Sequence, residues 1–79
     1  MLLNNKRRTR LRGIEEDLGM ALNLLNSIYD EEQDCMDNVP ENLQDSERYS
    51  DMEACVEALS EAFYNLEEAM DSIKEAINR

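Results

Sequence analysis

The sequence predicts an all-α fold, a coiled-coil-like antiparallel helical hairpin, and three observations support this prediction. The 79 residues include only two glycines, one proline and no tryptophan, whereas leucine, alanine, glutamate and methionine, which favour helices, are abundant. Two long segments repeat apolar residues at heptad spacing, and Pro40 lies between them. A chain of this length forms one domain with a thin core, so a disulfide, a metal or a second subunit is expected to add stability.

The first helix is expected over about residues 10 to 38, where a heptad pattern (positions a to g) begins at residue 11. Its apolar stripe occupies positions a and d and is widened at e. The residues are Leu11, Leu18 and Leu25 at a; Ile14, Ala21, Ile28 and Cys35 at d; and Leu22, Tyr29 and Met36 at e.

The second helix is expected over about residues 47 to 78, with the same pattern and an outer face that is almost entirely acidic. Its stripe has large residues at a and e and small ones at d. They are Met52, Leu59, Leu66 and Ile73 at a; Cys55, Ala62, Ala69 and Ala76 at d; and Tyr49, Val56, Phe63, Met70 and Ile77 at e.

A corner over residues 39 to 46 is expected to reverse the chain. Pro40 disfavours helical backbone at the preceding residue and is well suited to begin a new turn. Ser50 and Glu53 form a capping box for the second helix, and Ser46 is an earlier candidate cap. Folding back near residue 45 brings a and d layers together, pairing Leu25 with Leu66, Leu18 with Ile73, Ile28 with Ala62, Ile14 with Ala76 and Ala21 with Ala69.

The same register brings Cys35 opposite Cys55. The two cysteines form either a disulfide that joins the ends of the helices at the corner or a pair of small apolar fillers at d positions. A reducing cytosol favours free thiols.

The first helix also carries apolar residues outside the predicted a and d seam: Met20, Leu22, Leu24 and Tyr29. One interpretation is that they are scattered surface hydrophobes, which are common. Their spacing of one turn favours a second contact surface, because a helix that is apolar on two sides normally has two partners. We therefore expect a homodimer in which two hairpins form a four-helix bundle.

Charge divides the chain into a basic arm, residues 1 to 12, and an acidic hairpin, residues 13 to 79. The arm has a charge of +5 from Lys6, Arg7, Arg8, Arg10 and Arg12, and the hairpin has a charge of −16 from 19 acidic and three basic residues. The arm either contacts nucleic-acid phosphates, folds onto the acidic hairpin, or is a solvated, frayed end. Direct nucleic-acid binding is not expected except through this arm, because the acidic hairpin repels phosphate.

The composition argues against enzymatic chemistry. The chain has no histidine, which most zinc sites and general bases use near neutral pH. No nucleophile is followed by a base at a suitable spacing, and there is no glycine-rich phosphate loop. We expect no catalytic residue, no metal site and no cofactor. With no apolar run long enough for a membrane span and no signal-peptide pattern, we expect a soluble, cytoplasmic protein without membrane contact.

Three short motifs recur in the same order in a group of small acidic helical-hairpin proteins of bacterial phages and mobile elements. Here they are Asp30 to Glu32, Asn38 to Gln44 (NVPENLQ) and Ser46 to Tyr49 (SERY). The chain resembles this group over roughly residues 13 to 77. The resemblance implies a phage-type accessory protein in a bacterial host cell, and it carries over no established activity.

Two classes of function remain. The first is a non-catalytic protein-binding module, such as a nucleic-acid-mimic inhibitor, that presents carboxylates to a basic host nucleic-acid-handling or defence protein. The second is a structural or assembly protein whose hairpin drives oligomerisation. The candidate partner-binding acids are Asp30, Glu31, Asp34, Asp37, Glu57, Glu61 and Glu68.

Overall fold

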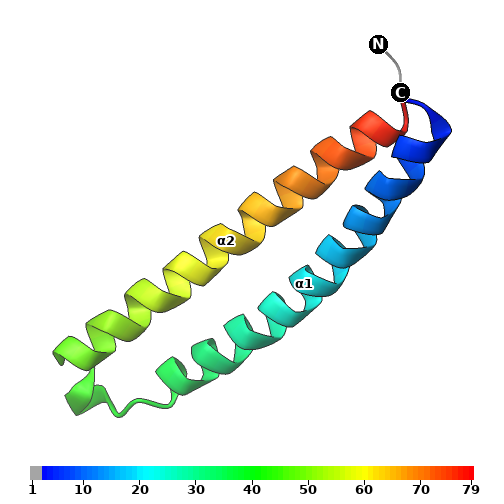
Figure 1. Cartoon of the computed structure of the whole chain (residues 1–79). Helices are drawn as coiled ribbons and strands as arrows, with labels where there is room; N and C mark the ends of the chain where they lie inside the picture. The colour runs from blue at the N-terminus through cyan, green and yellow to red at the C-terminus, as the bar shows by residue number, and fades with distance from the viewer. Residues whose placement is uncertain (1–2) are drawn as a thin grey trace.

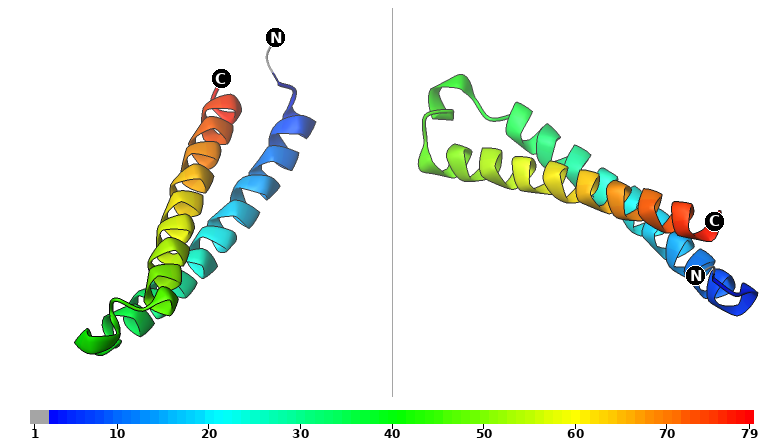
Figure 2. Two further views of the ribbon diagram at one scale, coloured as in Figure 1. Left: turned by 90° about the vertical axis from the view of Figure 1, so that its left-hand side faces the viewer. Right: turned by 90° about the horizontal axis from the view of Figure 1, so that it is seen from above.

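The computed structural model describes residues 3–79, and two long helices in it fold back on each other as a hairpin (Figure 1). Helix α1 spans Asn5–Asp37, a single 3₁₀ turn, η1, spans Glu41–Leu43, and α2 spans Glu47–Ile77. The described residues contain no β-strand, so the predicted all-α hairpin is confirmed. The molecule is one layer of two helices, 59 × 18 × 13 Å in extent. Figure 2 shows that the helices cross at a shallow angle and that the start of α1 and the end of α2 lie opposite the corner.

Helix α1 begins at Asn5 rather than near residue 10 because Asn4 caps it. Asn4 has extended backbone, and its Oδ1 accepts a hydrogen bond from the Arg7 backbone N–H at 2.9 Å. Thr9 lies within the helix, and its hydroxyl donates to the Asn5 carbonyl. The basic segment from residue 6 to residue 12 is therefore helical and continuous with α1. Residues 1 and 2 of the predicted arm lie outside the described residues.

Arg8 connects the start of α1 to the end of α2. Its Nε donates to the Leu3 carbonyl at 3.1 Å, and its second guanidinium nitrogen, Nη1, donates to the Ile77 carbonyl. Ile77 is the last residue of α2, where carbonyls lack partners within the helix and the helix dipole is negative. A guanidinium at this position thus satisfies a free acceptor with favourable charge. Through Arg8, the basic segment therefore contacts a backbone carbonyl of the acidic hairpin.

The corner is formed by residues that end α1, start η1 and cap α2. Asn38 ends α1, its N–H donating to the Asp34 carbonyl at 3.1 Å, and Pro40 precedes η1. Ser46 then caps α2, its Oγ accepting from the Tyr49 N–H at 3.1 Å. The earlier of the two candidate caps is therefore the one used, and Ser50 lies inside α2. The end of α1 and both ends of α2 lie within one residue of the expected positions.

The two helices pack in the register that the sequence predicts. A methyl group in place of the Gly19 hydrogen would lie 3.6 Å from Met70 Cε. Further along, Tyr29 of α1 lines the same hollow as Ser60 and Phe63 of α2. These neighbours match, to within one residue, a chain that folds back near residue 45.

The rotation of the helices differs from the prediction, because the seam uses positions a and e and not a and d. The three buried side chains of the described chain, Leu22, Val56 and Ile77, all occupy position e. At position d, Ile14 is 46% exposed and Ile28 is 40% exposed. The prediction that d residues form layers of the seam is therefore wrong. These residues lie along the flank of the hairpin.

Side-chain size explains this rotation. In α2 the d positions hold Arg48 at the start of the helix and then only cysteine and alanine, whereas the e positions hold large apolar residues. Turning both helices toward e buries more apolar area, and the stabilisation scales with that area. The e residues of α2 that pack in this way are Val56, Phe63, Met70 and Ile77.

We expect Leu22→Ala to lower the free energy of unfolding by about 2–3 kcal/mol, because it leaves a cavity in the seam. Met20→Ala removes a side chain that is 67% exposed in the same turn of α1, and a change of less than about 0.5 kcal/mol is expected. Urea unfolding followed by circular dichroism checks both values. Equal losses for the two variants would contradict the a/e seam.

We expect Arg8→Ala to lower the free energy of unfolding by about 1 kcal/mol, because the C-terminal carbonyl of α2 loses a charged donor. Lys6→Ala removes the same charge from an exposed position in the same turn and serves as the control. Thermal unfolding followed by circular dichroism compares the two. If Lys6→Ala costs as much as Arg8→Ala, net charge and not the contact with Ile77 is responsible.

Candidate binding surface

The acidic residues singled out in the sequence are all exposed, but they do not share one face. Glu57 and Glu61 line a groove together with the aromatic residues Tyr29 and Tyr64. Glu31 occupies position g of α1 and lies toward the opposite side of the hairpin. The others project from the outer sides of the two helices: Asp30, Asp34 and Asp37 from α1, and Glu68 from α2.

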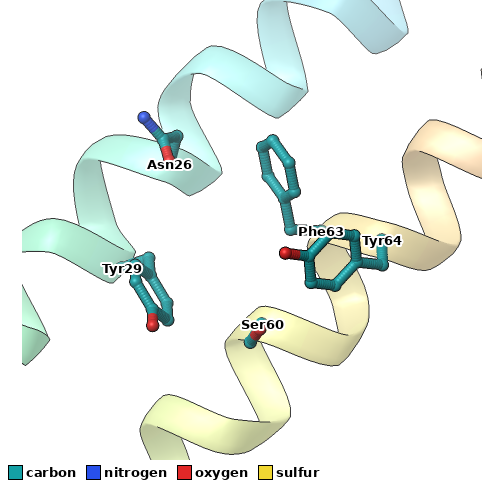
Figure 3. Close-up of a pocket in the computed structure, with 5 residues that line it drawn as sticks. All are labelled: Asn26, Tyr29, Ser60, Phe63 and Tyr64. Atoms are coloured by element: carbon teal, nitrogen blue, oxygen red, sulfur yellow. The ribbon is translucent and has the colours of Figure 1, made fainter.

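The centre of this groove is aromatic (Figure 3). Asn26 and Tyr29 from α1 line it on one side, and Ser60, Phe63 and Tyr64 from α2 line it on the other. The rings of Phe63 and Tyr64 meet edge to face, with centroids 5.9 Å apart and planes at 86°, a favourable aromatic geometry. Tyr64 is 64% exposed, so most of its ring remains available to a partner.

Carboxylates border the groove on both sides of this centre. Toward the corner, Glu53 and Glu57 lie beside Met36 and Tyr29. Toward the chain termini, Glu16 and Glu67 lie beside Met70 and Phe63. We call this surface the acidic groove; its residues are Glu16, Asn26, Tyr29, Met36, Glu53, Glu57, Ser60, Glu61, Phe63, Tyr64, Glu67 and Met70.

The carboxylates of the acidic groove are not neutralised within the described chain. Over residues 3–79 the single ion pair joins Arg79 to Glu75, 2.8 Å apart, at the exposed end of α2. Asp37 accepts a hydrogen bond from Gln33 Nε2 at 3.1 Å. The glutamine amide is uncharged, so this bond does not neutralise the carboxylate. Cations from another molecule can therefore approach the groove without first displacing an internal partner.

The four residues expected at an oligomer interface divide among three locations. Leu22 is buried in the seam, and Tyr29 is half-buried and lines the acidic groove. Met20 is 67% exposed and borders the same groove beside Glu16 and Met70. Leu24 is 64% exposed at position g of α1.

Cys35 and Cys55 are both free and exposed. Cys35 lines an apolar hollow at the corner with Val39 and Leu43, which follow it in the chain, and with Tyr49 of α2. Cys55 does not line this hollow.

The acidic groove as a unit was not apparent in the sequence. The sequence pattern assigns Tyr29 to an oligomer interface and gives no role to Tyr64. The available signal was the register, which places residue 29 opposite residue 60, together with the one-turn spacing of Ser60 and Tyr64.

No protein-family model matches this chain, and neither a curated protein nor a solved structure matches it at a significant level. Within residues 3–79 no helix has both the length and the apolar character needed to cross a membrane. The same residues contain no group of three or more cysteine, aspartate or glutamate side chains arranged to hold a metal ion.

We expect the melting temperature to rise by several degrees when the salt concentration is raised from about 0.01 M to about 0.15 M. The physical reason is the net charge of −11 on a molecule only 18 × 13 Å in cross-section. The screening length falls from about 30 Å, which exceeds that cross-section, to about 8 Å, so repulsion between the two helices weakens. Thermal unfolding in KCl and in potassium glutamate checks this. A flat or falling melting temperature in both salts would show that charge repulsion is not a significant term.

Proposed function

We propose that this protein is a non-catalytic binding protein that presents the acidic groove to a basic surface of another protein. The partner class we infer is a nucleic-acid-handling or defence protein of a bacterial cell, which the chain inhibits by occupying a nucleic-acid site. The observation that carries the proposal is a row of exposed, unneutralised carboxylates bordering the exposed ring of Tyr64 and the half-buried rings of Tyr29 and Phe63.

The charge density of the hairpin supports mimicry of a nucleic-acid strand. The chain carries a net charge of −11, and the molecule is 59 Å long. It thus has one net negative charge per about 5.4 Å, while a single DNA strand has one per about 3.4 Å. A basic cleft that binds a strand through its phosphates would attract this surface and speed its association.

The aromatic centre supports a specific interaction over a purely ionic one. Carboxylates mainly raise the association rate, and their effect is screened by salt. Rigid aromatic side chains such as Tyr64 provide apolar area at low entropic cost and dominate binding at many interfaces. Proteins that bind single strands use aromatic stacking beside charge, and the acidic groove combines the same two kinds of group with the charge reversed.

The resemblance to small acidic hairpin proteins of phages and mobile elements supports an accessory role in such an element. The three motifs that carry it lie at the end of α1, in the corner and at the start of α2, where they include Pro40 and the cap Ser46. These motifs build the reversal of the chain, and so they support the shared hairpin and not a particular partner.

A structural or assembly role is the second candidate. Exposed apolar side chains on α1, Ile14, Leu24 and Ile28, favour self-association of the hairpin. A homodimer would bury these side chains while the carboxylates keep the assembly soluble.

The triple variant Glu53→Gln, Glu57→Gln and Glu61→Gln tests the binding proposal. Immobilised wild-type chain is incubated with a bacterial lysate at low salt, and captured proteins are displaced with a single-stranded oligonucleotide. We expect the variant to retain about one tenth of the capture or less, since three partner-facing charges are lost. We also expect the displaced proteins to be nucleic-acid-binding proteins.

The matched control is Glu41→Gln, Asp45→Asn and Asp71→Asn, which removes the same charge from exposed sites outside the acidic groove. It should retain most of the capture. Equal loss in the two variants, or capture that neither salt nor oligonucleotide reverses, would rule out recognition through the acidic groove.

A further inference from the structure

The hairpin has a second long face that is nearly free of charge. The d positions recur every seven residues beside the seam: Ile14, Ala21, Ile28 and Ala69 are exposed, and Ala62 and Ala76 of α2 are half-buried. We call this the neutral face.

Both rows lie on the same side of the molecule. Antiparallel helices that pack through the same heptad positions are related by a two-fold axis, which places equivalent positions on one face. The acidic groove shows this on the opposite side, where Asn26 and Ser60, both at position b, line one hollow from the two helices. On the side of the neutral face, Ile14 lines a hollow together with Arg7 and Arg10.

A third apolar position in every heptad is more than a two-helix hairpin needs. Two apolar positions per heptad make the seam of a two-stranded coiled coil, whereas helices in a bundle have three. The hairpin also exposes 6235 Å², which is about 1,300 Å² more than expected for a compact protein of 9.2 kDa. A typical interface buries about 800 Å² on each partner, so this excess is sufficient for a stable contact.

The charges at the two ends of the neutral face identify its occupant as a second copy. Arg7 and Arg10 flank it at the open end of the hairpin. At the corner end Glu31 and Asp51 flank it together with Arg48 at position d, so the acids exceed the base there by one. Apart from Asp17, the positions d and g between these ends are uncharged on both helices. A two-fold axis can place the corners at the same end or at opposite ends, and opposite ends bring the basic end of one copy against the net acidic end of the other.

We propose that two copies pack neutral face to neutral face with their corners at opposite ends, forming a four-helix bundle. The basic end of each hairpin then lies against the acidic end of the other. Both acidic grooves remain on the outside, on opposite sides, so one dimer offers two binding surfaces and gains avidity on a partner with two sites. This inference rests on the homodimer proposed above and adds its face and its orientation.

The first experiment tests the face with Ala69→Glu and Ala54→Glu, measured by sedimentation equilibrium. Both alanines are exposed in α2, but only Ala69 lies on the neutral face, and Ala54 lies at position c on the outer side. We expect wild type to be a dimer of 9.2 kDa chains and Ala69→Glu to raise the dissociation constant about a hundredfold. Ala54→Glu should leave it unchanged, and circular dichroism should show both variants folded.

The second experiment tests the orientation by the sign of a charge effect. In the reversed dimer, Arg10→Glu places like charges together at both ends and should raise the dissociation constant about tenfold. Arg12→Glu makes the same charge change at position b, away from the neutral face, and is the control. Adding Glu31→Arg to Arg10→Glu should restore the affinity.

The outcomes separate the inference from the functions proposed above. A chain that stays monomeric at all concentrations overturns the dimer and its face together. If Arg10→Glu lowers the dissociation constant, the two corners lie at the same end of the dimer, which overturns the orientation alone. A dimer that survives Ala69→Glu overturns the face. The triple variant of the acidic groove should dimerise like wild type, because it leaves the neutral face intact.

Discussion

The narrow apolar seam between α1 and α2 is the contact on which the rest of the structure depends. Two helices in a single layer cannot surround a side chain on all sides, so Leu22, Val56 and Ile77 alone are buried in the described chain and the other seam residues are half-covered. Because so little area is available, each helix turns its largest apolar residues inward. That rotation determines what the outer faces contain: carboxylates and aromatic rings on one side, alanines and isoleucines on the other.

Repulsion between negative charges acts against the packing of the two helices. Sixteen net negative charges over residues 13 to 79 repel one another, and over residues 3–79 one ion pair offsets them. The cations are concentrated instead at the start of α1. There Arg8 meets the carbonyl end of α2, and Arg7 and Arg10 border the neutral face. The position of the basic residues therefore matters more than their number, since one joins the chain ends and two give the molecule a basic pole.

Much of the fold could be predicted from local sequence, while the binding surfaces could be predicted only in part. The helices, the corner and the pairing register follow from heptad spacing, Pro40 and Ser46, which act over a few residues each. The start of α1 was placed too late, because the Asn4 cap and the contact of Arg8 with Ile77 were not considered, and the latter joins residues at opposite ends of the chain. The exposure of the acids was predictable, since an unpaired carboxylate is rarely buried. The aromatic centre of the acidic groove was not, because it takes Tyr29 from one helix and Tyr64 from the other.

Heptad spacing, capping residues and a proline are short-range signals, and they are sufficient to specify two helices, a turn and an acidic exterior. Which apolar positions enter the seam depends on how much apolar area each helix face buries against the other helix. Packing of the two helices therefore decides it. Here the larger residues at position e prevailed over the small ones at d. The tertiary structure thereby left a neutral face outside the seam and assembled a groove opposite it, two features that neither helix contains alone.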